Sequence, residues 1–539
     1  MSYYLLWVET LLACLLFAAM LITAGLRRKL SMVKIPLYAA GLVLPLFPIG
    51  GVVAVFAALR FGAGLRYSGF WWAMALVVCY LTGAIAILMG ARRSDAAGMR
   101  RALSWPLARI TTAWLVVVSL IAMTFWNLDL RAQMEIQALR TEAGAIALSA
   151  APPQVPDAVN AAWVYEQADR QYKAAQSAAD QRIDYRDLDS RSAEVRDYLN
   201  RQQKALATIR RAADMPQCRL DYDYGKPDLA VIMPRLNLYH AHAIFLAVAA
   251  DAEAANGSAD AALADCLRIY AIGQHANSSP LLIGELVTMG IDALASKTVA
   301  RVLPNVTAKE QMQQFSAPEP DVLSRGFARS LRSEEAFGLA RFCDMGSGQS
   351  FQDELVAVSG EQYPAKAVPS FGTLVWLLWA REDVNIYREY LYRERDIAQM
   401  AYYQSAAERK KIADELQPGR RRGVMSAIVT PSILKSIESL ARTQALRASV
   451  GVACAATRYR LDHGQYPATS DLLVPAYLEA MPVDPFDGQA MRTKKLPDGN
   501  LVIYSVGADG KDDGGVVDSP DSKTPPTDVG ITLKMPAAG

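Results

Sequence analysis

The sequence predicts a mainly α-helical protein with a membrane region at its N-terminus and a small α+β domain at its C-terminus. Three observations support this fold class. The first 128 residues are mostly apolar, residues 157–423 have helical spacing of apolar positions, and turn-rich motifs with a strand pattern follow. A chain of 539 residues exceeds one compact domain. We therefore expect three regions, at 1–130, 151–423 and 424–539.

The membrane region is predicted from four apolar runs, each apolar on all sides and close to the length that spans a bilayer. Lipid offers the backbone no hydrogen-bond partners, so each run is expected to be a helix. Their approximate ranges are Tyr3–Leu26, Pro36–Leu59, Phe70–Gly90 and Thr111–Leu128. A region of this kind makes the lipid bilayer the first expected partner.

The orientation follows from the basic residues of the short loops, which are more frequent on the cytoplasmic side. The first and third loops are rich in Lys and Arg and the second is poor (Arg27, Arg28, Lys29 and Lys34; Arg92, Arg93, Arg100, Arg101 and Arg109; Arg60 and Arg66). We expect a multi-pass protein of the inner membrane with its N-terminus and all residues after Leu128 outside the cytoplasm. The first run is interpreted as a retained helix. Glu9 is expected near the membrane interface.

The middle region reads as an array of helical hairpins, weakly similar to a tetratricopeptide array but without a fixed repeat. Its clearest pair is Leu236–Asn256, ended by Gly257, and a second helix to about His275 with Asp260 as a cap. Trp163–Ala175 and Leu282–Leu303 are expected to be further members.

Other segments flank this array. Residues 129–150 are predicted to extend the fourth membrane helix, up to a break at Ala151–Pro156. A later helix is expected from Trp376 through Tyr403. Its segment Tyr387–Arg395 reads as a solvated face that a partner could bind.

Candidate catalytic residues of the middle region are few. His240, His242, His275 and Glu285 could in principle bind a metal, but no recognised catalytic motif surrounds them, so structural roles are favoured. Ser347 lacks a nucleophile-elbow pattern and is read as a loop residue. Cys218, Cys266, Cys343 and Cys454 show no CxxC pairing; they allow one disulfide in an oxidising compartment or four buried thiols.

The C-terminal region carries three motifs in order. A long helix over Pro431–Arg460 leads into the YRLDxGxYP pattern at Tyr459–Pro467. PxDPF follows at Pro482–Phe486, after a short expected helix near Asp471. The YSxGADG pattern of Tyr504–Gly510 then ends a predicted strand that begins at Leu501.

These motifs resemble the periplasmic head of the major, G-type pseudopilin of bacterial type II secretion, over roughly residues 424–539. The resemblance implies a long helix packed on a small antiparallel sheet and a calcium-binding final loop. It implies calcium ligands at the Val506 carbonyl, at Asp509, and later in the loop at Asp513, Asp518 or Asp521. Carboxylates and carbonyls on a Gly-rich loop suit this ion, whereas a solvated acidic turn without an ion is the alternative reading.

Two departures separate the chain from a filament subunit. The corresponding helix starts near Gly423, inside the chain, and is only mildly apolar, so it cannot anchor or assemble as a pseudopilin helix does. Asp487 also looks like an insertion between Phe486 and Gly488. The chain is therefore expected to keep the head as a module.

Three function classes are considered, and the absence of catalytic motifs and the binding-type architecture favour the first, which is not an enzyme. The first is a membrane-anchored scaffold that binds a protein partner outside the cytoplasm, with a link to type II secretion or envelope assembly. The second is a hydrolase with His240 or His275 beside Glu285 in a cleft of the helical region. The third is a sensor or transporter subunit built on the four membrane helices, with Glu9 facing inward. The net charge of +2 gives no reason to expect a nucleic-acid partner.

Overall fold

The computed structural model divides the chain into two compact units, which we describe separately. The first comprises residues 1–137, 343–353 and 363–380, and the second the remainder. The structure describes residues 123–124, 127–128, 130–176, 189–225, 229–315, 320–347, 380–417, 423, 426–517 and 526–536. The four predicted membrane segments lie outside these residues except for 123–124 and 127–128, and Glu9 and Trp376 also lie outside them.

Few residues of the first unit are described. Residues 130–150 are helical, as predicted for the extension that follows the fourth apolar run. In the part of this helix that belongs to the first unit, the carbonyl oxygen of Ile136 accepts a hydrogen bond of 3.5 Å from the Cys343 thiol.

Among the described residues, one helical stretch is long and apolar enough to cross a membrane, Val231–Ala255. Half of its most apolar window is buried within the structure. This stretch belongs to a helix at the centre of the second unit, and its length and composition are also those of a core helix.

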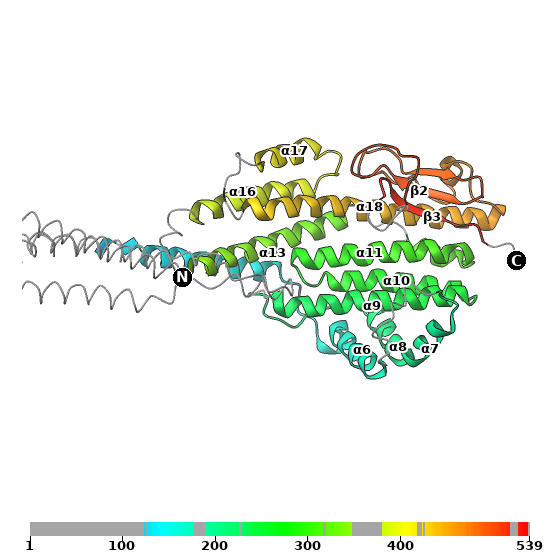
Figure 1. Cartoon of the computed structure of the whole chain (residues 1–539), viewed down its shortest axis with the longest axis horizontal. Coiled ribbons are helices and arrows are strands. Elements are labelled where there is room, and N and C mark those ends of the chain that lie inside the picture. Colours follow the sequence, from blue (N-terminus) through cyan, green and yellow to red (C-terminus); the bar gives the residue numbers. More distant parts are fainter. Residues whose placement is uncertain are drawn as a thin grey trace, which may run out of the picture. The chain divides into compact units, whose positions relative to one another are not determined.

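The second unit is built on a helical array (Figure 1). Its helices are α6 (Ala161–Ala175), α7 (Ala193–Arg201), α8 (Gln203–Ala213), α9 (Leu229–Ala255), α10 (Ala259–Ala276) and α11 (Leu282–Val302). Helices α9, α10 and α11 pack side by side, α6–α8 pack on one side of this layer, and α18 packs against α11 on the other. The predicted hairpin members at 163–175 and 282–303 correspond to α6 and α11.

The turn between α9 and α10 forms where the sequence predicts it but is capped differently. Gly257 ends α9 with a φ of 88°, a left-handed conformation that favours glycine. The expected cap role of Asp260 is wrong. Its carboxylate instead accepts hydrogen bonds of 2.8 and 2.9 Å from the backbone N–H groups of Thr307 and Ala308, just before the short helix α12 (Lys309–Met312).

Three further helices follow the array: α13 (Pro320–Ser347), α16 (Arg381–Ala398) and α17 (Ala406–Glu415). Helix α16 ends five residues before the predicted Tyr403. The expectation of a solvated face at Tyr387–Arg395 is confirmed for Tyr392, which is 41% exposed, and wrong for the other two tyrosines. Tyr387 and Tyr390 are buried, and the Tyr387 hydroxyl donates to the Glu334 carbonyl at 2.8 Å. Contacts with neighbouring helices, which the spacing of α16 alone does not reveal, bury these two rings. Ser347 ends α13 and is not in a loop.

The C-terminal residues form a helix on a sheet, which confirms the expected mainly α chain with a small antiparallel sheet. Helix α18 (Ser426–His463) begins before the predicted Pro431 and packs on β2 (Leu501–Ser505) and β3 (Val529–Leu533) of a sheet whose remaining strand is β1 (Arg492–Lys495). The strand order is β1-β2-β3, all antiparallel. Every residue of the central strand is buried, which suits its apolar sequence. The expected short helix is a 3-10 turn at Ser470–Leu473.

Hydrogen bonds join two of the C-terminal motifs. The buried Asp484 of PxDPF accepts from the Ser505 hydroxyl at 2.7 Å and from the Val506 backbone N–H at 3.0 Å. Gly507 follows with a φ of 69°, and a Cβ there would overlap the Thr527 carbonyl oxygen. The spacing of these motifs therefore has a structural cause, because one buried carboxylate holds the end of β2.

Candidate binding site

The start of α6 is fixed by its own cap and by a loop that lies far away in the sequence. The Asn160 side chain accepts from the backbone N–H groups of Ala162 at 3.2 Å and Arg219 at 2.9 Å, and donates to the Arg219 carbonyl at 2.9 Å. An N-cap side chain of this kind satisfies a free N–H of the first turn. The loop around Arg219 is thereby held against the first turn of α6.

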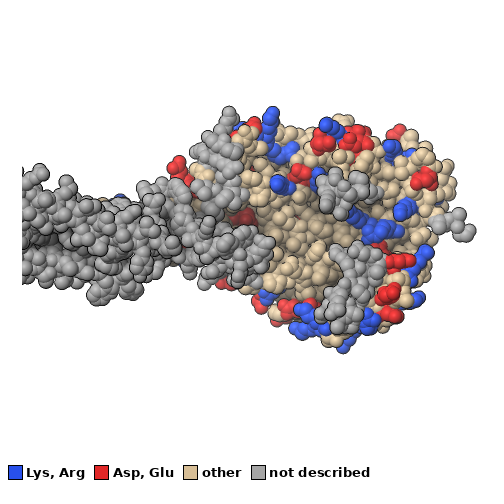
Figure 2. Space-filling view, in the orientation of Figure 1, with Lys and Arg blue, Asp and Glu red and all other residues tan. Residues whose placement is uncertain are grey.

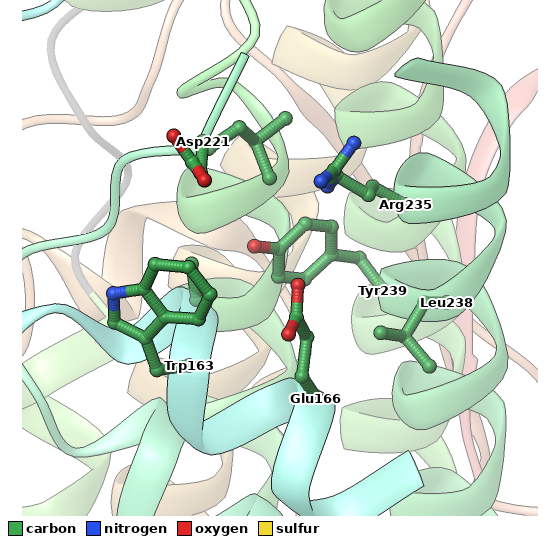
Figure 3. A pocket seen from close by; sticks show the side chains of 8 residues that line it. Trp163, Glu166, Asp221, Arg235, Leu238 and Tyr239 are labelled. Carbon is green, nitrogen blue, oxygen red and sulfur yellow. The ribbon is translucent and has the colours of Figure 1, made fainter. Parts of the chain in front are cut away.

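This junction borders a pocket between α6, the loop and α9, which we call the α6–α9 pocket. Its empty volume is about 280 Å³, part of which is open solvent. The pocket is lined by Ala162, Trp163, Glu166, Leu220, Asp221, Arg235, Leu238 and Tyr239. Figure 3 shows the Tyr239 ring at the centre, with Trp163 and Glu166 from α6 and Arg235 from α9 around it.

The rim of the pocket carries an exposed tryptophan. Trp163 is 39% exposed although it is a large apolar residue. Its indole N–H donates to the Asp157 carboxylate at 3.1 Å, which fixes the ring at the start of α6. A rigid, exposed aromatic ring is a frequent anchor of protein interfaces.

Three charged side chains complete the lining, and none of them makes an ion pair with the described residues. Glu166 and Arg235 are half-buried and Asp221 is exposed. Arg235 donates a hydrogen bond of 3.1 Å to the Val231 carbonyl of its own helix. The pocket thus has an apolar floor and charges that the described residues leave uncompensated.

Behind the floor lies a cluster of two buried tyrosines, two buried histidines and a half-buried cysteine, which we call the tyrosine–histidine cluster (Tyr165, Tyr239, His242, His275 and Cys218). The Tyr165 hydroxyl and His275 Nδ1 share a hydrogen bond of 2.9 Å. The Tyr165 ring lies 5.0 Å from the Tyr239 ring and 5.7 Å from the His242 ring. The Tyr239 hydroxyl and the Cys218 sulfur are 3.2 Å apart.

The electrostatics of this cluster favour neutral groups. Burial lowers the pKa of His242 and of His275 to about 4. Burial also raises the pKa of the Cys218 thiol to about 11. At neutral pH the cluster therefore holds two neutral imidazoles and a protonated thiol. This is the reverse of the thiolate that a cysteine nucleophile requires.

The histidines and the glutamate singled out in the sequence do not meet in the pocket. His242 and His275 both contact the Tyr165 ring, His240 is exposed on α9, and none of the three lines the pocket. Glu285 belongs to a different polar group, near Asn277 and Gly326.

That second group links α11 of the array to α18, which together with its sheet we call the head (described residues 426–517 and 526–536), and we call the group the α11–α18 seam (Glu285, Asp292, Arg447 and Tyr270). Arg447 of α18 donates two hydrogen bonds to the Asp292 carboxylate of α11, at 2.7 and 2.8 Å. Its guanidinium carbon lies 4.5 Å from the Tyr270 ring centroid. Burial raises the pKa of Glu285 to about 7. The seam is thus ionic, whereas the tyrosine–histidine cluster is neutral.

Three of the predicted calcium ligands, Val506, Asp509 and Asp513, lie within the described residues. The backbone of Val506 is held by Asp484, and Asp509 is exposed and accepts from the Lys511 backbone N–H at 3.1 Å. Asp513 is also exposed, whereas Asp518 and Asp521 lie outside the described residues. Among the residues that the structure describes, no three carboxylate, imidazole or thiol side chains come together as a metal site.

The sequence analysis missed the carboxylate that organises this loop. Asp528 is fully buried and accepts from the backbone N–H groups of Gly515 at 2.8 Å and Val516 at 3.0 Å. The sequence signal that could have pointed to Asp528 is its position directly before the last strand. Asp512 is occupied as well, since it accepts from the Tyr504 hydroxyl at 3.1 Å. The chemistry of Asp509 and Asp513 fits calcium, but they do not form a complete site by themselves.

None of the four cysteines considered for a disulfide is paired. Cys266, Cys343 and Cys454 are buried and Cys218 is half-buried. Within each of these surroundings the thiol acts as a small apolar or weakly polar group, which agrees with the free-thiol alternative.

Charges of both signs are interspersed over the described part of the face seen in Figure 2. That distribution does not resemble the one-signed stripe of a nucleic-acid-binding surface. No family model, curated protein or solved structure matches this chain.

Proposed function

We propose that the chain is a membrane-anchored scaffold that binds a protein partner outside the cytoplasm through the α6–α9 pocket. The observation that carries this proposal is the pocket itself, which combines an exposed, fixed tryptophan with three charged side chains that make no ion pair with the described residues. An exposed aromatic ring and charged groups of this kind can make favourable contacts with a bound protein that they do not make within the free chain.

The neighbouring groups support binding over hydrolysis. The thiol and imidazoles behind the floor are kept neutral by burial, and the glutamate that a hydrolase would need lies in the seam. The tyrosine–histidine cluster therefore serves as a firm wall for the pocket. The ion pair of Arg447 and Asp292 attaches the head to the array. A partner bound at the pocket would thus be held in a fixed relation to the head.

The anchor and the location are part of the same proposal. The four apolar runs and the loop charges support a multi-pass inner-membrane protein whose residues beyond 128 face away from the cytoplasm. The order of motifs supports a pseudopilin-like head and a role linked to type II secretion or envelope assembly. A calcium ion on Asp509, Asp513 and Asp518, with the Val506 carbonyl, belongs to this proposal.

Site-specific photo-crosslinking in native membranes tests the binding function. A benzophenone amino acid at the half-buried, pocket-lining Leu238 is expected to trap one discrete protein partner. The adduct should disappear when Trp163 is replaced by Ala, and a benzophenone at the exposed Val516 of the head should not give it. Equal adducts from both positions, or an adduct unaffected by Trp163→Ala, would contradict the proposal.

A further inference from the structure

We infer that the α6–α9 pocket accepts one positively charged side chain, a lysine or an arginine, from the partner protein. This inference rests on the proposed binding function and names the chemistry that the pocket recognises. The charge of the lining gives the first reason. Glu166 and Asp221 supply two carboxylates, Arg235 supplies one guanidinium, and none is neutralised by an ion pair with the described residues. These three lining side chains together carry a net charge of one negative unit, from two carboxylates and one guanidinium.

The aromatic lining gives the second reason. The Trp163 indole is exposed at the rim, and the Tyr239 ring forms the floor. The indole N–H is already bound to Asp157, so the π-system is what remains for a ligand. Aromatic faces attract cations, with tryptophan the strongest. Trp163 and Glu166 stand three residues apart on α6, and such residues are neighbours on one helix face.

The position of Arg235 explains why the pocket does not select an anion. One of its guanidinium nitrogens already donates to the Val231 carbonyl, and two carboxylates line the same pocket. An incoming carboxylate would meet both of them, which is unfavourable at close range. Figure 3 shows the Arg235 head directed away from Glu166, on the far side of the Tyr239 ring. From there it can bind a backbone carbonyl of the segment that carries the cation.

The size of the pocket points to a single side chain. Its empty volume of about 280 Å³ already includes open solvent, so the enclosed space is much smaller and has room for the end of one side chain. An extended lysine or arginine presents an apolar stem and a charged head. The stem would lie on Leu238 and Tyr239 while the head reaches Glu166 and Asp221.

Saturation-transfer NMR with small probes tests this directly, on the full chain in nanodiscs of zwitterionic lipid. The probes are n-butylguanidinium and n-butylammonium, with butyrate and n-butanol as comparisons. We expect saturable binding of both cations and weaker binding of butyrate. The double variant Glu166→Gln/Asp221→Asn should weaken cation binding roughly fivefold or more, as the loss of two exposed ion pairs implies.

A matched control removes the same charge elsewhere on the array. Glu194→Gln/Asp197→Asn changes two exposed carboxylates of α7 and should leave cation binding within about twofold of the parent, as for surface changes away from a site. Stronger binding of butyrate, lost in Arg235→Gln, would overturn the inference. Cation binding that is unchanged in the Glu166→Gln/Asp221→Asn variant would overturn it too.

The crosslinking experiment separates the two proposals. If the adduct from Leu238 forms in the parent and persists at full strength in Glu166→Gln/Asp221→Asn, the partner binds without a cation and only the inference fails. If no adduct forms in the parent, the proposed binding function fails. Loss of the adduct in the double variant, together with weaker cation binding, supports both.

Discussion

Two polar groups of the second unit bury titratable side chains in different ways: one keeps them neutral, and the other pairs them as ions. The tyrosine–histidine cluster keeps His242 and His275 neutral and satisfies Tyr165 and Tyr239 with neutral hydrogen bonds. The α11–α18 seam keeps a bidentate ion pair. The neutral group stands behind an open pocket, whereas the ionic group joins two parts of the fold.

The difference has a physical reason. A buried charge is costly unless it is paired with good geometry, and Arg447 and Asp292 hold each other through two hydrogen bonds. No carboxylate among the described residues accepts a hydrogen bond from His242, so burial favours its neutral form. The comparison indicates that the seam holds α18 against α11, and that the neutral cluster supports the floor of the α6–α9 pocket. Each assignment has consequences for stability that can be measured.

Breaking the seam should have the largest effect. Arg447→Met leaves the Asp292 carboxylate buried without its partner, and we expect a loss of about 3–5 kcal/mol in unfolding free energy. Chemical denaturation of the full chain in detergent, followed by circular dichroism, measures it. The double variant Arg447→Met/Asp292→Leu should regain most of the loss. A single variant within about 1 kcal/mol of the parent, the range of a surface ion pair, would mean that the seam does not hold the head.

The pH response of the seam comes next. Glu285 has a pKa of about 7 in the folded chain. Its ordinary value is 4.5, so between pH 4.5 and 7 the native state binds more protons than the unfolded state and stability falls as pH rises. Glu285→Gln removes this loss. Between pH 4.5 and pH 8, the parent should therefore lose about 3 kcal/mol more unfolding free energy than the variant. Parallel pH profiles of variant and parent would disprove the assignment.

The tyrosine–histidine cluster should respond with the opposite sign. The pKa of His242 is about 4 when folded and 6.5 ordinarily, so between these values the unfolded state binds more protons. Stability then rises with pH and is lost as pH falls. Between pH 7 and pH 5, the parent should therefore lose about 2 kcal/mol more unfolding free energy than the His242→Leu variant. Its two ring nitrogens make no hydrogen bonds with the described residues, so little is lost at pH 7. An equal loss of stability at low pH in the variant and the parent would show that His242 is not the group whose protonation destabilises the fold.

The smallest expected effect concerns the proposed calcium loop of the head, which lies apart from both groups. A loop of millimolar affinity should stabilise the head by about 1–2 kcal/mol in 5 mM calcium. Thermal unfolding in calcium and in chelator measures the shift. Asp509→Asn should abolish it and Glu479→Gln, an exposed head residue, should not. Equal melting temperatures in calcium and chelator would remove calcium from the proposal.

Much of the fold could be predicted because local signals agree with the tertiary structure. Helices α6, α10 and α11 follow from apolar spacing, and Gly257 ends α9 because it takes a positive φ. Predictions failed where distant contacts decide. Asp260 caps a later turn, and Tyr387 and Tyr390 are buried by neighbouring helices.

The candidate site shows the same division. The sequence by itself determined the apolar runs, the helical array, and the order of motifs in the head, because these depend on periodicity and on residues close in the chain. Only the tertiary structure decided that Trp163, Asp221 and Arg235 share a pocket and that Arg447 meets Asp292 across 155 positions. The reason is physical: pairing of charges and burial of aromatic rings depend on which helices meet, and no local pattern encodes that meeting.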